Sequence, residues 1–264
     1  MSLVSWRSPF GFALSLVAVL VIAYIIGPLI VIVGSSVGGA GYLSFPPEGF
    51  SLQWYSKLIR EPLYLNGFLT SLRIASTVTL LSLLIGIPAA YALAYRGFRG
   101  ASTLVSIFLS PLMLPSLVLA VALTIFFSHW PLTTGNNRLV LAHLIICIPC
   151  VLRVTIPAFQ RLDPALEEAA LNLGATPLKA FLLVTLPVVK SGFAAAGALA
   201  FIMSFDEFDM ALFLSDPAQM PLTVVLYTKA QLAFDPTLAA AASSLILMML
   251  VLMILVQIVR MLRG

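Results

Sequence analysis

The chain has 264 residues, of which 61% are hydrophobic and 9% are charged, and its formal net charge is +4. Soluble globular domains contain roughly 25% charged residues. The composition therefore excludes an ordinary soluble domain and indicates an integral membrane protein.

Six apolar segments have the length of a membrane span, about 20 residues for about 30 Å of hydrocarbon. Because lipid offers the backbone no hydrogen-bond partner, such segments are expected to be helices. Strands of a membrane barrel would be shorter and would alternate in polarity. We therefore predict an all-α integral membrane protein with one transmembrane domain over residues 1–264. The predicted spans are 11–33, 68–95, 104–127, 139–159, 188–214 and 238–261.

Lysine and arginine predict the orientation in the membrane, because short cytoplasmic loops carry an excess of both. An even number of spans places both termini on one side, and nine basic residues fall on that side against four on the other. Both termini are therefore expected in the cytoplasm, and the positive charge is explained without nucleic acid binding. The nine are Arg7, Arg96, Arg99, Arg153, Arg161, Lys179, Lys190, Arg260 and Arg263, and the four are Lys57, Arg60, Arg138 and Lys229.

The first apolar segment follows an arginine and precedes the small residues 34–36, an order that a cleaved signal peptide also has. Its apolar run is longer than 20 residues, whereas the apolar core of a signal peptide has about 7 to 15. We expect an uncleaved membrane anchor.

The sequence lacks the common motifs of catalytic and metal sites. Cys147-Ile148-Pro149-Cys150 has the spacing of a thiol redox pair, but it lies inside an apolar span, where packing residues are expected. His129 and His143 have no Cys, Asp or Glu at ligand spacing, and neither H-E-x-x-H nor G-x-S-x-G occurs. The Walker A motif is also missing. We expect no enzyme activity, no ATP hydrolysis and no metal site on this chain.

Segment 160–187, on the predicted cytoplasmic side, is the long polar exception in the chain. Asp163-Pro164 is a typical helix start, with an N-cap acceptor and a proline in the first turn. Gly174 is expected to end this helix, because glycine readily takes the left-handed conformation found there. Between them an apolar stripe follows helical spacing, with polar residues on another face. The stripe is Leu166, Ala169, Ala170 and Leu173, and the polar residues are Glu168 and Asn172.

A second start signal, Thr176-Pro177, follows the glycine, and a second amphipathic pattern then leads to Leu186-Pro187. We predict two short amphipathic helices joined by a glycine turn. Such a pair can also lie on a membrane surface without any protein partner.

The spacing of this segment resembles the EAA signature of ATP-binding-cassette (ABC) importer permeases, E-A-A-x3-G-x9-I-x-L-P. Here it is Glu168-Ala169-Ala170, three residues, Gly174, nine residues, then Val184-Thr185-Leu186-Pro187, with Val in place of Ile. The span count, the orientation and the position before the fifth span match as well. The resemblance covers most of the chain and implies a six-helix, type I importer permease in the plasma (inner) membrane of a prokaryote.

In that family the EAA segment is a coupling helix that docks on a cytoplasmic ATPase. The resemblance implies that Glu168 contacts the ATPase, that Ala169 and Ala170 allow close approach, and that Gly174 sets the angle between the helices. Leu186 and Pro187 complete the coupling segment. The implied partners are an ATPase dimer that binds ATP and Mg²⁺, a second and related permease subunit, and an external solute-binding protein. No cofactor is expected on this chain.

The fifth predicted span contains three acids within Ser204-Phe205-Asp206-Glu207-Phe208-Asp209. Each acid costs roughly 2.5 to 3.5 kcal/mol at the centre of a membrane helix, so the three are expected to face a wet cavity or the external mouth. On one helix Asp206 and Asp209 would share a face, and Glu207 would point about 100° away. Two interpretations stay open: the acids pair with Arg73 or a partner subunit, or they form a transient site for a cationic substrate.

This region resembles the polyamine branch of the permease family, which carries Ser-hydrophobic-Asp-Asp here and a later Leu-Pro, in this chain Met220-Pro221-Leu222. The stretch 110–115 is also similar to that branch, and its prolines can break or kink the third span. Glu207 and the additional Asp209 depart from the simple acid pair. The resemblance implies putrescine or spermidine as the substrate, while related permeases carry opines and other organic solutes.

Two other classes of function fit the sequence less well than an importer permease does. A secondary transporter also uses intramembrane acids, but it usually needs more spans and an internal repeat, and neither is evident here. A membrane enzyme needs a catalytic constellation, and the sequence offers none. Co-purification of an ATPase would distinguish the importer permease from both.

Overall fold

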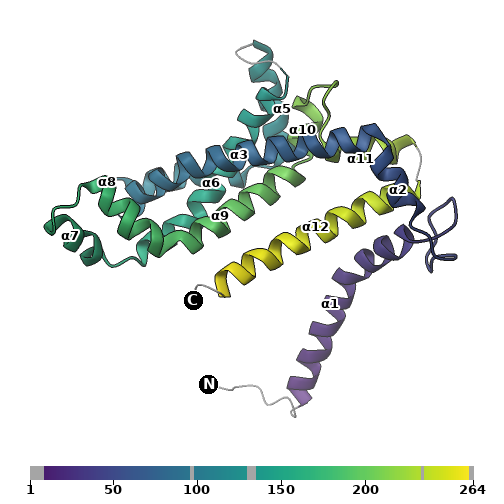
Figure 1. The fold of residues 1–264 in the computed structure, drawn as a ribbon, viewed down its shortest axis with the longest axis horizontal. Helices are drawn as coiled ribbons and strands as arrows, with labels where there is room; N and C mark the ends of the chain where they lie inside the picture. The colour runs from purple at the N-terminus through teal and green to yellow at the C-terminus, as the bar shows by residue number, and fades with distance from the viewer. Residues whose placement is uncertain (1–8, 96–97, 130–134, 233–234, 262–264) are drawn as a thin grey trace. The chain divides into compact units, whose positions relative to one another are not determined.

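The computed structural model describes residues 9–95, 98–129, 135–232 and 235–261, and every regular element within those ranges is a helix (Figure 1). This confirms the predicted all-α fold class. Arg7, Arg96 and Arg263, used above for the orientation, lie outside the described residues. In chain order the helices are α1 (Pro9–Ser36), α2 (Gln53–Arg60), α3 (Pro62–Ala94), α4 (Ala101–Leu109), η1 (Ser110–Met113), α5 (Ser116–His129), α6 (Asn137–Gln160), α7 (Pro164–Asn172), α8 (Pro177–Ala180), η2 (Phe181–Thr185), α9 (Leu186–Asp206), α10 (Asp209–Leu214), α11 (Leu222–Leu232) and α12 (Pro236–Met261).

Six helical segments are candidates for membrane spans in the described part of the chain. Five are long and apolar enough by themselves: Phe10–Ser36, Pro62–Ala94, Asn137–Gln160, Pro177–Asp206 and Pro236–Ile254. The sixth candidate joins Ala101–Met113 to Ser116–His129 across a bend of 97°. Leu114 at the bend is extended, with φ −84° and ψ 139°. Pro115 explains this, because a proline disfavours helical geometry in the residue before it and has no N–H to donate.

The chain divides into two compact units, and the first contains residues 1–62 and 226–248. Within it, hydroxyl groups connect α1 and α2 to α12. Tyr55 Oη lies 2.7 Å from Ser36 Oγ and donates to Ser243 Oγ at 3.1 Å. Lys57 of α2 also forms a 2.6 Å salt bridge to Asp235, just before α12. The segment that follows α1 is therefore an ordered part of this unit.

Asp235 caps the N-terminus of α12. Its Oδ1 accepts hydrogen bonds from the backbone N–H and the hydroxyl of Thr237, each at 2.6 Å. Partial burial raises the pKa of Asp235, but the hydrogen bonds from Lys57 and Thr237 outweigh that effect and hold the pKa below its usual value. The carboxylate therefore stays ionised at neutral pH, where it can stabilise the helix start.

The second unit contains residues 63–225 and 249–264 and is built around α3, α6 and α9. Small residues of α9, among them Ala196 and Ala200, are fully buried against this core. Cys147 of α6 packs there too, with its Sγ 3.6 Å from the carbonyl oxygen of Ala200. Small residues let membrane helices approach closely, which strengthens their van der Waals contacts. This core fixes α9, whose two ends carry the predicted sites.

Gly86→Ala is expected to destabilise this core. A Cβ at Gly86 would lie 2.7 Å from Cγ1 of Val151, a stiff and fully buried side chain of α6. Overpacking of this kind costs about 1 to 3 kcal/mol, which exceeds the roughly 1 kcal/mol that alanine gains over glycine in helix propensity. The thermal midpoint in detergent should fall for Gly86→Ala. Gly41→Ala is the control, since no atom lies within 4 Å of its added Cβ, and equal midpoints for the two variants would contradict the prediction.

Candidate functional site

Helix α7 has a defined cap at each end. At its start, Oδ1 of Asp163 accepts a hydrogen bond from the N–H of Ala165 at 3.0 Å. At its end, Gly174 adopts φ +88°, and its N–H donates to the carbonyl of Leu171 at 2.9 Å. The next N–H, of Ala175, donates to the carbonyl of Ala170 at 3.0 Å. This pair of bonds is a Schellman motif. The first predicted helix and its glycine turn are confirmed.

The second predicted short helix starts where it was expected, as α8, but it is not separated from the fifth span. Thr176 caps its start, as expected, by accepting from the N–H of Lys179 at 3.4 Å. The helix then continues without interruption from Pro177 to Asp206, through the π-helical turn η2. Pro187 explains the wide turn, because proline cannot donate to the carbonyl four residues earlier and crowds it. Leu186 accordingly donates to the carbonyl of Phe181, five residues back.

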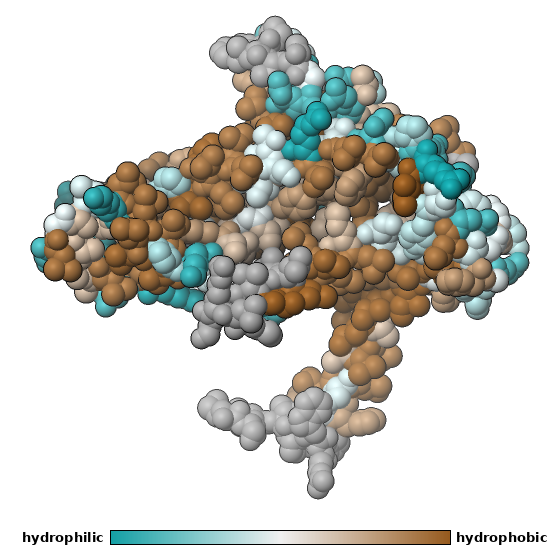
Figure 2. All heavy atoms as spheres, in the orientation of Figure 1, coloured by the Kyte–Doolittle hydropathy of each residue, from teal (hydrophilic) through white to brown (hydrophobic). Residues whose placement is uncertain are grey.

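The structure places the predicted docking residues on an accessible surface. Glu168, Ala169 and Gly174 are exposed and Ala170 is half-buried. Leu173, beside them, exposes 90% of its surface. Figure 1 places α7 at one end of the second unit, and Figure 2 shows hydrophilic and hydrophobic atoms mixed over that end. An exposed helix with both charge and apolar side chains is suited to bind another protein.

Glu167 is a site residue that the sequence reasoning missed. It exposes 2% of its surface, although the neighbouring Glu168 is exposed. Its Oε1 accepts a hydrogen bond from Tyr91 Oη at 2.5 Å, and its Oε2 accepts one from Thr185 Oγ1 at 3.0 Å. The EAA pattern assigns its glutamate to Glu168, and no sequence motif indicates the burial of Glu167, because the partners of Glu167 lie 76 and 18 residues away.

The acids near the end of α9 do not share one helix. Helix α9 ends at Asp206, Glu207 is extended with φ −65° and ψ 111°, and α10 starts at Asp209. The expectation that Asp206 and Asp209 share a helix face is therefore wrong. Glu207 accepts a hydrogen bond at 3.4 Å from the N–H of Met210 in the first turn of α10, and this contact helps to stabilise the break.

The three acids differ in their surroundings. Asp206 is exposed, whereas Glu207 and Asp209 are half-buried. Asp209 Oδ2 accepts a hydrogen bond from the hydroxyl of Ser116, the first residue of α5 after the proline bend. One helical turn before the break, Ser204 Oγ lies 2.8 Å from Nδ1 of the buried His143. Polar contacts therefore join α9 and α10 to the bent third span and to α6.

Arg73 lines a cavity of about 320 Å³ between α3 and the loop before α11. The cavity also contains the polar side chains of Asn66, Thr70 and Gln219. Arg73 is exposed, and among the described residues it forms no salt bridge with Asp206, Glu207 or Asp209. The structure thus gives no support to an internal pair between Arg73 and these acids.

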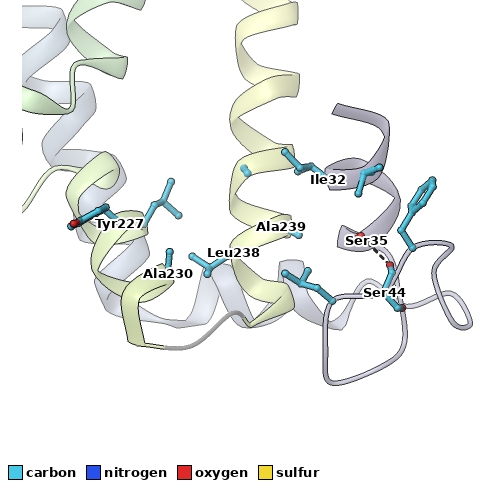
Figure 3. Close-up of a pocket in the computed structure, with 12 residues that line it drawn as sticks. Ile32, Ser35, Ser44, Tyr227, Ala230, Leu238 and Ala239 are labelled. Atoms are coloured by element: carbon cyan, nitrogen blue, oxygen red, sulfur yellow. Dashed lines mark hydrogen bonds between the residues drawn. The ribbon is translucent and has the colours of Figure 1, made fainter. Parts of the chain in front are cut away.

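A larger cavity of about 620 Å³ lies in the first unit (Figure 3). Its lining is almost entirely apolar, with Ile32, Leu238 and Ala239 among the side chains that point into it. Ser35 lies at its edge and donates to the carbonyl of Ser44 at 3.0 Å. None of the predicted site residues lines this cavity, and its surface offers no charged group to a solute.

Comparison with known proteins gives a consistent result. Residues 82–262 match the family model of the binding-protein-dependent transport system inner membrane component. The putrescine transport system permease protein PotI of Escherichia coli is 31% identical over 202 residues, which cover 74% of this chain and 72% of PotI. The spermidine/putrescine transport system permease protein PotC of Haemophilus influenzae is 29% identical over 243 residues, which cover 90% and 93% of the two chains.

A solved structure shares the fold. It is a bacterial ABC transporter involved in the import of the acidic polysaccharide alginate, and the match has a TM-score of 0.75 at 18% identity. It covers 96% of this chain and 99% of the matched one. The matched relatives are transport permeases rather than enzymes. This chain belongs to the family of binding-protein-dependent transport system inner membrane components, as the permease subunit of an ABC importer.

Proposed function

We propose that this permease forms half of the pathway of a polyamine importer and that its EAA segment, residues 163–187, docks on a separate cytoplasmic ATPase. The observation that carries the docking is the exposure of Glu168 and Ala169 on a helix that is capped at both ends. A rigid helix of this kind moves as one body when its partner closes. ATP and Mg²⁺ would bind to the ATPase, which hydrolyses the nucleotide.

The orientation follows from the basic residues. Both termini and the EAA segment lie in the cytoplasm, and the loops on the other side face the external binding protein that delivers the solute. A second permease subunit, related to this chain but not identical, completes the pathway. Arg153, Arg161, Lys179 and Lys190 support this orientation, because all four lie on the EAA side of the spans.

The substrate is putrescine or spermidine. The names of PotI and PotC support this choice, and so does the charge of the acids at the far end of α9. Asp206 is exposed there, so its carboxylate is available to a hydrated cation. Attraction weakened by water suits a transport site, because the solute must also leave. Arg73 would line the same pathway from α3 and would restrict where a cation can bind.

Two measurements test the proposal together. Affinity purification of the tagged permease should recover an ATPase of the ABC class and a second permease, whereas a secondary transporter or a membrane enzyme would recover neither. Calorimetry on the cognate external binding protein should then show tight binding of putrescine or spermidine. A binding protein specific for a neutral sugar or an anion would exclude polyamine import and would leave the permease assignment standing.

A further inference from the structure

We infer that Glu167 anchors the EAA segment internally and links the docking helix α7 to two membrane spans, α3 through Tyr91 and α9 through Thr185. This inference rests on the proposed docking of α7 and adds the route by which its motion reaches the membrane. Glu167 and Glu168 are neighbours on one helix, and consecutive residues point about 100° apart. Glu168 faces outward toward a partner, and Glu167 faces inward toward the spans.

The contacts of Glu167 are short and buried. The 2.5 Å distance from Tyr91 Oη to the Glu167 carboxylate is typical of a charge-assisted hydrogen bond. Thr185 is fully buried and donates to the second carboxylate oxygen at 3.0 Å. Each carboxylate oxygen thus accepts a hydrogen bond from a hydroxyl in a different segment of the chain. A buried carboxylate is costly to leave without its donors, so α7 is expected to move together with both segments.

Tyr91 extends this link into the membrane part of the unit. Its ring packs edge-on against Phe159 of α6 and Phe181 of η2, with centroid distances of 5.6 and 5.1 Å, and it stacks on Tyr95 at 5.2 Å. Phe159 in turn contacts Phe193 of α9 at 5.6 Å. Aromatic pairs with ring centroids about 4.5 to 7 Å apart stabilise each other. The hydroxyl that binds Glu167 therefore belongs to a ring of α3 that packs on α6 and η2 directly and on α9 through Phe159.

Thr185 makes the second link at a special point of the helix. It is the last residue of the π-helical turn η2, directly before α9 starts. Single π-helical turns occur often at functional sites, because they interrupt the regular hydrogen bonding of a helix. A displacement of Thr185 would therefore reach α9 through this π-helical turn. The far end of the same helix carries Asp206.

The test uses the complete complex in proteoliposomes, with the ATPase, both permeases and the binding protein, and with radiolabelled putrescine and ATP as probes. Tyr91→Phe and Thr185→Val are each expected to lower putrescine uptake per ATP hydrolysed about tenfold, the size expected for the loss of one charge-assisted hydrogen bond. The ATPase should stay in the complex. Glu167→Gln keeps one acceptor oxygen, so its putrescine uptake per ATP should fall less than that of Glu167→Leu.

Thr155→Val is the matched control. Thr155 is also fully buried, but its hydroxyl donates to the carbonyl of Val151 within its own helix at 2.7 Å. Its uptake per ATP should equal that of the wild type. Wild-type uptake per ATP in both Tyr91→Phe and Thr185→Val would overturn the inference while the proposed function stands. Release of the ATPase by these variants would overturn it too, since Glu167 would then only shape the docking surface.

A second measurement keeps the inference testable if the wild-type complex does not import putrescine, a result that would count against the proposed substrate. Spin labels on α7 and α3 report their distance with and without ATP. The two helices should keep a constant distance in the wild type. In Tyr91→Phe the distance should change on addition of ATP, and a constant distance in that variant would overturn the inference.

Discussion

Gly174→Val is expected to reduce solute uptake about tenfold or more, because a non-glycine residue in the left-handed region costs about 1 to 2 kcal/mol and a β-branched one more. Gly174 has φ +88°, and the Schellman bonds at the end of α7 depend on that conformation. No atom lies within 4 Å of a Cβ added there, so the effect is one of backbone strain and not of a clash. Membrane insertion should be unchanged. Solute uptake and the amount of permease in the membrane are measured on the same cells.

Two further variants sharpen this prediction. Gly174→Asn should retain most of the uptake, because asparagine tolerates the left-handed conformation better than other residues with a side chain. Glu168→Arg changes the charge of an exposed position without touching the core, and it should also uncouple transport. Uptake at the wild-type level in both Gly174→Val and Glu168→Arg would contradict the proposed docking of the EAA segment on the ATPase.

Much of the EAA segment could be predicted because its structure is local. The cap at Asp163 and the turn at Gly174 depend on residues within a few positions of each other, so residue type and spacing are sufficient. The start of the second helix at Pro177 was also predicted correctly, whereas its separation from the fifth span was predicted wrongly. Pro187 marks a helix start in many sequences, but here it lies within a continuous helix whose preceding turn has widened to accommodate it.

The remaining site features depend on contacts that no local pattern encodes. The break after Asp206 contains neither glycine nor proline. It is stabilised by the hydrogen bond from Met210 to Glu207 and by the hydrogen bond between Ser116 and Asp209, which lie 93 residues apart. The burial of Glu167 likewise requires Tyr91 from another span. The apolar spans themselves were predictable, because the thickness of the membrane sets their length and composition.

Asp206→Asn is expected to raise the KM of putrescine uptake about tenfold, since opposite charges 4 Å apart contribute about 1 kcal/mol in bulk water and about 4 kcal/mol near a protein surface. Asp206 is exposed, and its carboxylate has no hydrogen bond or salt bridge to any residue the structure describes. Its charge is therefore available to a cationic solute, and its removal should leave the thermal midpoint unchanged. Initial uptake rates over a range of putrescine concentrations give the KM, and thermal unfolding in detergent gives the midpoint.

Asp209→Asn should show the opposite pattern, a lower thermal midpoint with little change in KM, because its carboxylate accepts from Ser116 and joins α10 to α5. Ser116→Ala should reproduce that loss, and the double variant should be no less stable than the worse single one, as expected for two partners of one contact. A lower midpoint in Asp206→Asn with an unchanged KM would give that residue a structural role as well. A raised KM in Asp209→Asn at an unchanged midpoint would instead indicate that the cation contacts Asp209. Ser116 and the solute would then compete for the same carboxylate.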